Sequence, residues 1–237
     1  MKRNDFDLVA PIYDGLASLV FGGAIRRSQL AYVPDVRGVD NALVIGGGTG
    51  WFLLELLART DVKRVVYVEL SESMLEKSRE LIRGRNPDWL SRVKFLHGTE
   101  QSITAEDGPF DLIVTNFFLA CFGDANCTQM IERLYPHLAP KGRWLFVDFE
   151  VPPGGVNRIA ASVLFKVMFT FFNVVSDLES KGPPNYGLGF GKVKLRTLLD
   201  RTFYAGMIRV RLMANAAGDH ASRVASTSHD RAAAESG

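Results

Sequence analysis

The fold of this chain is indicated most directly by one segment, Ala42-Leu43-Val44-Ile45-Gly46-Gly47-Gly48-Thr49-Gly50-Trp51. It opens with an apolar run of the length of a buried strand, and the helical pattern Phe52-Leu53-Leu54-Glu55-Leu56-Leu57 follows it. The glycines between the two permit positive φ angles and remove the Cβ atoms that would keep a ligand away from the backbone. The stretch therefore predicts a strand, a turn that can seat a cofactor, and a helix.

Short apolar runs continue to alternate with amphipathic stretches along the chain. We expect strands at 42–45, 65–70, 93–96, 111–116 and 143–149, and helices at 51–59, 72–83 and 127–138. Alternation over 193–199, the turn residues Ala205-Gly206 and an apolar run over 207–213 add a closing hairpin. This order predicts an α/β fold: a Rossmann-like three-layer sandwich with a mostly parallel seven-stranded sheet and a C-terminal antiparallel hairpin.

The length of 237 residues suits one large domain, which we place at 1–213. Within it, apolar residues at helical spacing, interrupted by Gly22-Gly23, predict an N-terminal helical cap over 1–38. An insertion over 150–190 is expected to act as a lid. The remainder, 214–237, is small, polar and rich in alanine, and it predicts a disordered tail.

Composition narrows the functional classes. The net charge of +2 disfavours a partner bound through many phosphates, so we expect no nucleic acid. Two cysteines supply no disulfide framework, and no Cys/His spacing predicts a metal site. The N-terminus lacks the apolar run of a secretory signal, so a cytoplasmic protein is expected. The sequence leaves the oligomeric state open.

Glu69 stands at the end of the strand predicted over 65–70, about 20 residues after Gly50, where an acidic side chain can accept both hydroxyls of a ribose. A nicotinamide-dependent oxidoreductase would share this start. Its glycine spacing, counted from Gly46, requires glycine at position 51, where this chain has Trp51. The pattern disfavours that enzyme class.

Over residues 40–150 the ordered motifs resemble those of class I S-adenosylmethionine-dependent methyltransferases. The resemblance implies S-adenosyl-L-methionine as cofactor, with the ribose on Glu69, the adenine beside Leu70, and its amino group near Thr99 or Glu100. Thr99 replaces a common aspartate, and Val44 replaces a common acidic residue. The implied cofactor-binding residues are Gly46, Gly47, Gly48, Gly50, Glu69, Leu70, Thr99, Glu100 and Asn116.

Asn116 follows strand 111–116 in the position that faces the methyl-transfer region in this family. It leads into Phe117-Phe118 without the prolines of the Asn-Pro-Pro-Tyr signature, which disfavours methylation of DNA or glutamine. Tyr13-Asp14-Gly15-Leu16 resembles the N-terminal helix of the ubiquinone/menaquinone C-methyltransferase group. The candidate catalytic residues are Asn116, Tyr13 and Asp148, with His97 as a further candidate base.

The apolar segment 156–175 bears on the acceptor. Its residues Val163, Phe165, Met168, Phe169, Phe171 and Phe172 could line a pocket for a hydrophobic acceptor, rest on a membrane surface, or pack on the sheet. Basic residues of the hairpin region could meet anionic lipid heads or form a solvated face; they are Lys192, Lys194, Arg196, Arg209 and Arg211. We expect a small, hydrophobic or lipid-like acceptor and peripheral membrane contact.

Two other hypotheses about the function stay open. A polyamine aminopropyltransferase, which uses decarboxylated S-adenosylmethionine, shares the glycine turn and Glu69, but after strand 111–116 this chain has no carboxylate until Asp124. A non-catalytic partner subunit could keep the fold and bind the cofactor to support another protein.

Overall fold

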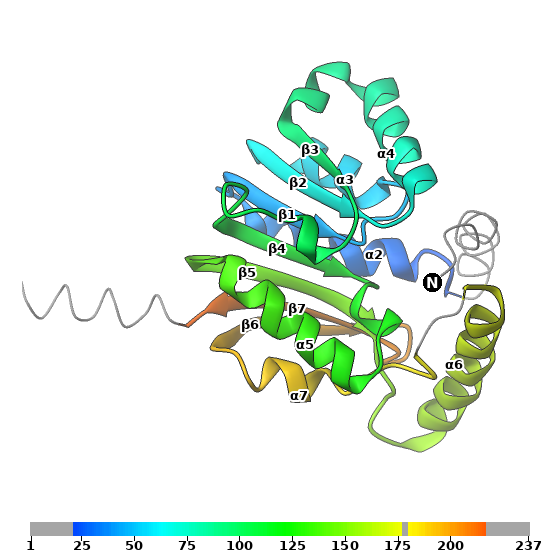
Figure 1. The fold of residues 1–237 in the computed structure, drawn as a ribbon. Coiled ribbons are helices and arrows are strands. Elements are labelled where there is room, and N and C mark those ends of the chain that lie inside the picture. The colour runs from blue at the N-terminus through cyan, green and yellow to red at the C-terminus, as the bar shows by residue number, and fades with distance from the viewer. Residues whose placement is uncertain (1–20, 177–179, 217–237) are drawn as a thin grey trace, which may run out of the picture.

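The structure, a computed structural model, describes residues 21–176 and 180–216; for 171–176 it describes the backbone alone. A seven-stranded sheet has the order β3-β2-β1-β4-β5-β7-β6, in which β7 runs antiparallel to β5 and β6 and the other pairs are parallel. Figure 1 shows this sheet with helices on both faces. The strands are β1 (Asn41–Ile45), β2 (Arg64–Glu69), β3 (Val93–His97), β4 (Phe110–Asn116), β5 (Leu138–Phe149), β6 (Leu195–Phe203) and β7 (Ile208–Asn215).

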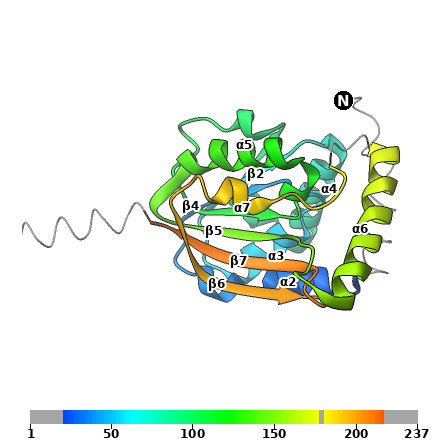
Figure 2. The same ribbon diagram turned by 90° about the horizontal axis from the view of Figure 1, so that it is seen from below.

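Helices cover the sheet as the prediction of a three-layer sandwich requires. The α-helices are α2 (Ala24–Leu30), α3 (Trp51–Arg59), α4 (Glu72–Arg85), α5 (Asp124–Leu134), α6 (Gly155–Ser176) and α7 (Tyr186–Phe190). Short 3-10 helices are η1 (Val33–Val36), η2 (Pro87–Arg92), η3 (Glu100–Ser102), η4 (Leu119–Cys121) and η5 (Tyr135–His137). In Figure 2, α5 and α7 lie on one face of the sheet and α2 and α3 on the other. The predicted fold class is confirmed.

Alternation along β1 explains why the sheet is covered on both faces. Ala42 and Val44 pack in the core with α2, α3 and α4, whereas Leu43 and Ile45 pack in the core with α5 and α7. Because both faces are buried, the strand reads in sequence as a continuous apolar run. Ile45 lies level with Val68 of β2 and Thr115 of β4, so the carboxyl ends of these strands meet at one edge.

Two predicted boundaries around β5 are wrong. The helix predicted over 127–138 begins at Asp124 and ends at Leu134, and the strand predicted from 143 begins at Leu138. Pro136 has no backbone N–H to continue the helix, and the chain enters the short helix η5 there. Leu138 then pairs with Phe110 of β4. This contact joins segments far apart in the sequence, so the local periodicity could not predict that the strand begins there.

The hairpin extends beyond its predicted end. Ala214 and Asn215 belong to β7, so the tail predicted to be disordered from 214 is wrong at these residues. Asn215 pairs with Leu195 across the hairpin, and its side-chain amide donates to the Ala139 carbonyl at 3.0 Å. Within the predicted cap, the helix that follows Gly22-Gly23 is α2. The part of the cap before residue 21, with Tyr13, lies outside the described residues, as does 217–237.

Candidate cofactor and active site

The glycine turn between β1 and α3 serves two purposes. Gly46, Gly48 and Gly50 have positive φ angles of 65°, 63° and 86°. A Cβ atom on Gly50 would lie 2.6 Å from the Cβ of Ser78 in α4, and one on Gly47 would lie 2.3 Å from the Tyr67 ring. Gly47 and Gly50 are therefore required for packing. A Cβ atom on Gly48 would meet nothing within 4 Å, so the space beside its Cα atom is open to a ligand.

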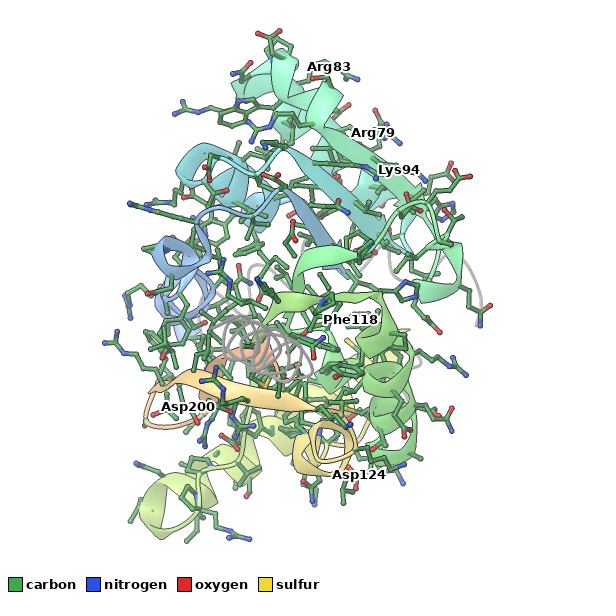
Figure 3. All side chains as sticks on the ribbon, turned by 90° about the vertical axis from the view of Figure 1, so that its left-hand side faces the viewer. Arg79, Arg83, Lys94, Phe118, Asp124 and Asp200 are labelled. Carbon is green, nitrogen blue, oxygen red and sulfur yellow. The ribbon has the colours of Figure 1, made fainter. Side chains whose placement is uncertain are left out.

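Phe118 closes over the first glycine of the turn. A Cβ atom on Gly46 would lie 2.4 Å from Cδ2 of Phe118, whose ring also packs edge-on against Phe122 at 5.2 Å. Figure 3 shows Phe118 near the middle of the view, below Arg79 and above Asp200. Because Gly46 has no side chain, the ring of Phe118, which follows β4, can pack directly against the glycine turn. The sequence did not predict this contact.

Glu69 ties the end of β2 to the glycine turn. Its side chain is buried; Oε2 accepts from the Gly48 backbone N–H at 2.9 Å and Oε1 accepts from the Ser71 N–H at 2.9 Å. Burial raises the pKa of this carboxyl above its usual value, and the backbone donors oppose that shift. Each carboxylate oxygen keeps further lone-pair capacity beyond one bond, which a pair of ribose hydroxyls can use.

Tyr67 is a site residue that the sequence analysis missed. Its ring packs on Gly47, and its hydroxyl donates to the Gly48 carbonyl at 2.9 Å. The sequence does contain a feature that could have identified Tyr67: it is an aromatic residue with a polar hydroxyl, two positions before Glu69, in a strand expected to be buried. The glycine turn is consequently held from β2 by both Glu69 and Tyr67.

The residues predicted for adenine gather at the carboxyl ends of β2 and β3. Leu70 is 43% exposed and offers an apolar surface there, and its carbonyl oxygen lies 2.9 Å from Nε2 of His97. The Thr99 hydroxyl accepts from the backbone N–H of Gln101 at the start of η3. An ion pair with Arg133 of α5 occupies Oε1 of Glu100 at 2.8 Å.

Asn116, the last residue of β4, has a buried side-chain amide. Among the described residues, neither its nitrogen nor its oxygen has a hydrogen-bond partner. An unsatisfied buried polar group costs about 1–3 kcal/mol, so such a group calls for an explanation. The chain then turns sharply: Phe117 has a φ of 52° and its N–H donates to the Val147 carbonyl at 2.7 Å. The structure thus brings Asn116 to the same sheet edge as Gly48 and Glu69.

Asp148, a candidate catalytic residue, lies in the interior near the end of β5 and is fully buried. Its two oxygens accept backbone N–H bonds from Ala120 at 3.0 Å and Phe149 at 2.9 Å. Burial raises the pKa of its carboxyl to about 7, against the effect of these donors. This geometry suits a residue that holds η4 against β5. Tyr13 lies outside the described residues.

The raised pKa of Asp148 makes stability depend on pH. The pKa of Asp148 is about 7 in the folded chain and near 3.8 in the unfolded chain. The stabilisation of the fold that comes from the protonated carboxyl is therefore present at acidic pH and is lost as the pH rises through 7. We expect the free energy of unfolding to fall by up to about 1.4 kcal/mol per pH unit between about pH 5 and 7 from this group. Urea unfolding of wild type and Asp148→Asn across that range measures it. Parallel pH curves for the two proteins would contradict the expectation.

The insertion after β5 differs in part from its prediction. One face of α6 joins the core through Ala161, Phe165, Met168 and Phe169, and Phe165 packs on Phe149 at 5.5 Å. Val163 lies on the opposite face and is 60% exposed, so of the predicted alternatives it does not pack on the sheet or share the buried face of Phe165. The side chains of Phe171 and Phe172 lie outside the described residues.

The basic residues predicted for the hairpin region (Lys192, Lys194, Arg196, Arg209 and Arg211), which we call the basic stripe, are mostly paired with carboxylates. Arg209 lies between Asp200 at 2.5 Å and Glu150 at 3.0 Å. Arg211 also approaches Asp200, at 3.5 Å, and the exposed Lys192 approaches Glu132 at 3.4 Å. These acidic partners divide the stripe, so it does not form one continuous cationic surface.

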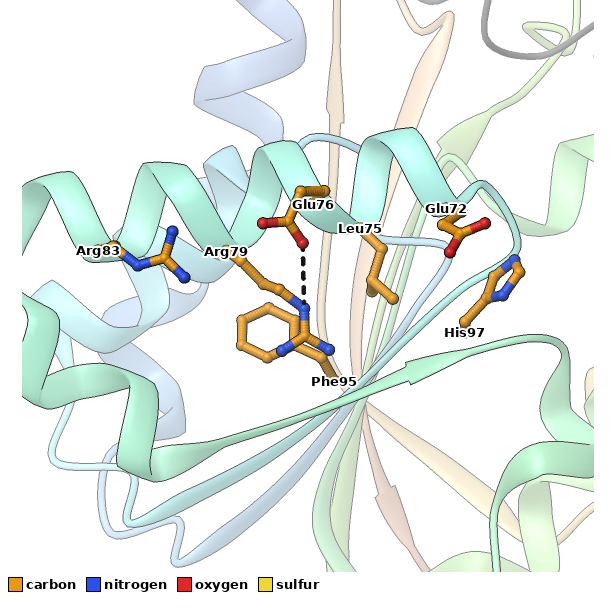
Figure 4. Close-up of a pocket in the computed structure, with 7 residues that line it drawn as sticks. All are labelled: Glu72, Leu75, Glu76, Arg79, Arg83, Phe95 and His97. Atoms are coloured by element: carbon orange, nitrogen blue, oxygen red, sulfur yellow. Dashed lines mark ion pairs between the residues drawn. The ribbon is translucent and has the colours of Figure 1, made fainter.

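A separate hollow of about 430 Å³ lies between α4 and the edge strand β3. Its lining mixes both charges: Arg79 sits 4.4 Å above the Phe95 ring and approaches Glu76 at 3.8 Å (Figure 4). The lining residues are Glu72, Leu75, Glu76, Arg79, Arg83, Phe95 and His97. The glycine turn does not line it, so this hollow is distinct from the site at the carboxyl ends of β1, β2 and β4.

Comparison with known proteins agrees with this geometry. Residues 42–142 match the family model of a methyltransferase domain, which spans the glycine turn, Glu69 and Asn116. The matched segment is a methyltransferase domain of the class I S-adenosylmethionine-dependent type. The resemblance inferred from the sequence motifs is confirmed, and the cofactor of this family is S-adenosyl-L-methionine.

Curated relatives of the methyltransferase include quinone-biosynthesis enzymes. It is 29% identical over 168 residues to the demethylmenaquinone methyltransferase of Thermus thermophilus, a match covering 70% of the chain and 74% of that relative. It is also 29% identical over 156 residues to the ubiquinone/menaquinone biosynthesis C-methyltransferase UbiE of an Enterobacter species, covering 64% of the chain and 60% of that relative. The chain thus spans less than two thirds of the Enterobacter protein.

Solved structures share the fold at low identity. The mitomycin 7-O-methyltransferase MmcR superposes with a TM-score of 0.64 at 20% identity, covering 89% of the chain and 60% of MmcR. The N-methyltransferase NodS of Bradyrhizobium japonicum, solved with S-adenosyl-L-homocysteine, gives 0.54 at 16% identity, covering 81% of the chain and 86% of NodS. Among the described helices, none has the length and apolarity needed to cross a membrane.

Proposed function

We propose that the methyltransferase moves the methyl group of S-adenosyl-L-methionine to a small hydrophobic acceptor that carries an aromatic or quinol-like ring. The observation that carries this proposal is the buried, unpartnered amide of Asn116 at the sheet edge where the space beside the Gly48 Cα atom is open and Glu69 presents a buried carboxylate. A donor and an acceptor buried without partners fit a bound ligand.

The residues present fit the cofactor of the family. Glu69 would accept the ribose hydroxyls, the open space beside the Gly48 Cα atom would take the ribose and methionine portions, and Leu70 would cover the adenine. Thr99 and Glu100 flank that end, although Arg133 already engages Glu100. When bound, the cofactor supplies an electrophilic sulfonium methyl group. The protein then contributes mainly by position, because direct displacement needs the acceptor atom in line with the carbon–sulfur bond.

Aromatic side chains between Asn116 and α6 favour a flat apolar acceptor. Phe117 packs on Phe149 at 4.8 Å, and Phe149 in turn packs on Phe165 of α6 at 5.5 Å. Phe149 and Phe165 are buried, so Phe117, which is partly exposed, is the ring of this group that can face a ligand, and aromatic rings favour tilted or edge contacts with one another. In transfer, the acceptor atom forms the bond to the methyl carbon as the carbon–sulfur bond breaks, sulfur keeps the electron pair, and the acceptor loses a proton. The names of the quinone methyltransferase relatives are consistent with such an acceptor.

Calorimetric titration separates this function from the alternatives. The purified chain would be titrated in parallel with S-adenosylmethionine, S-adenosylhomocysteine, decarboxylated S-adenosylmethionine and NAD. Binding of the first two, followed by methyl transfer to a quinol acceptor, supports the proposal. Preference for the decarboxylated form would indicate an aminopropyltransferase, and cofactor binding with no transfer to any acceptor would indicate a non-catalytic partner subunit.

Asn116→Leu tests the assigned role of the amide. Leucine has a similar size but no polar atoms, so the variant should be at least as stable as wild type, because an unsatisfied buried amide is removed. We expect its affinity for S-adenosylhomocysteine to fall about fivefold, the loss of roughly one net hydrogen bond. Urea unfolding and calorimetry give the two quantities. Unchanged affinity together with lower stability would indicate that Asn116 is a structural residue.

A further inference from the structure

Helix α6 presents a stripe of apolar side chains to solvent. Val156, Ile159, Val163 and Val167 follow one another at intervals of three or four residues and are 82%, 69%, 60% and 65% exposed. Residues at this spacing lie on one side of a helix, so the four form a continuous surface. Scattered exposed apolar residues need no explanation, whereas a contiguous apolar surface marks an interaction site.

The opposite side of α6 is anchored, which fixes the direction of the stripe. Ala161 and Phe165 are fully or almost fully buried, and Phe165 packs on Phe149 at the end of β5. Figures 1 and 2 show α6 standing at the margin of the molecule, beyond the ends of the strands. The stripe therefore faces away from the core, at the edge of the sheet that holds the candidate site.

Charge along α6 has one sign. Between Gly155 and Ser176 the sequence contains Arg158 and Lys166 and no acidic residue. Both cations are exposed, and no carboxylate among the described residues pairs with either one. Lys166 immediately precedes Val167 and lies three residues after Val163, so it flanks the stripe. Arg158, two residues after Val156, lies on the other side of the helix and donates to the Pro153 carbonyl at 3.3 Å, so Lys166 is the cation beside the stripe. An apolar face with a cation at its margin matches the boundary between acyl chains and anionic headgroups.

We propose that α6 docks the protein on the surface of an anionic phospholipid bilayer, with Val156, Ile159, Val163 and Val167 in the acyl boundary and Lys166 at the headgroups. A helix held in this way lies in the plane of the interface, which agrees with the finding that no described helix can cross a membrane. Docking of this kind does not depend on the identity of the methyl acceptor, because the stripe lies outside the group of aromatic side chains between Asn116 and α6.

Vesicle co-sedimentation of the full chain tests this surface. The vesicles contain phosphatidylcholine and phosphatidylglycerol in equal parts, or phosphatidylcholine alone. We expect wild type to bind the mixed vesicles and Val163→Asp to bind them about tenfold more weakly, because a carboxylate would enter the acyl boundary. Lys166→Glu should reduce binding about fivefold or more at low salt, since one cation contributes about that factor near an anionic surface. Leu188→Asp, at an exposed leucine of α7, is the matched control and should bind like wild type.

Several outcomes would overturn the assignment. Wild type that does not bind mixed vesicles, or Val163→Asp that binds as wild type does, rules out the stripe. Equal binding to phosphatidylcholine alone rules out recognition of anionic lipid. Sedimentation velocity tests the alternative that a second copy of the chain covers the stripe. A wild-type dimer that Val163→Asp dissociates would make this face an interface between two copies of the chain. Circular dichroism checks that each variant is folded.

Discussion

Glu69→Ala is expected to weaken binding of S-adenosylhomocysteine at least tenfold. A hydrogen bond to a charged group contributes about 1.5–3 kcal/mol, and this carboxylate is assigned to the ribose hydroxyls. The same change removes the acceptor of the Gly48 backbone N–H, so the glycine turn loses an anchor at its open position. Both effects lower the affinity for the cofactor, and calorimetric titration of the folded variant measures their sum.

Two further variants separate those effects. Glu72→Ala removes an exposed carboxylate three residues later, at the start of α4, and should leave affinity unchanged. Glu69→Gln keeps the size and one acceptor oxygen but turns an amide nitrogen toward one of two backbone donors. It should therefore bind more weakly than wild type and retain more affinity than Glu69→Ala. A folded Glu69→Ala protein with wild-type affinity would remove Glu69 from the ribose site.

The local sequence pattern was sufficient to predict the first strand, the glycine turn and the helix after it, and to identify Glu69 as a candidate site residue. The helix predicted over 51–59 has those bounds in the structure, because its apolar period is regular and Gly50 marks its start. Glu69 could be found from its place at a strand end, and the structure puts it against Gly48. In both cases the information lies within a short stretch of chain, where periodicity and glycine chemistry are direct guides.

Contacts between distant segments could not be predicted in the same way. Phe118 lies against Gly46, and Tyr67 donates to the Gly48 carbonyl, because β4 and β2 flank β1 in the sheet, and local periodicity does not reveal which strands are neighbours. Helix α6 shows a related limit. It is apolar on nearly every side, so periodicity could not separate the buried Phe165 from the exposed Val163. Only packing against Phe149 determines which side is buried.

Gly50→Ala is expected to destabilise the fold by about 2–5 kcal/mol. Its φ of 86° costs a residue with a side chain about 1–2 kcal/mol, and overpacking adds about 1–3 kcal/mol. The added Cβ would lie 2.6 Å from the Cβ and 2.9 Å from the backbone Cα of Ser78, so a side-chain rotation does not relieve the contact. Urea unfolding should show the loss, or the variant should fail to accumulate as folded protein.

Gly48→Ala is the matched comparison, because it has the same left-handed conformation without the contact. Its φ is 63° and its Cβ would meet nothing within 4 Å, so we expect a stability loss of only about 1–2 kcal/mol. If the open space beside the Gly48 Cα atom seats the cofactor, the added methyl group occupies that space and weakens S-adenosylhomocysteine binding in a protein that still folds. Equal stability losses for the two alanine variants would refute the division of the turn into a packing glycine and a ligand-facing glycine. Wild-type affinity in Gly48→Ala would place the cofactor elsewhere along the turn.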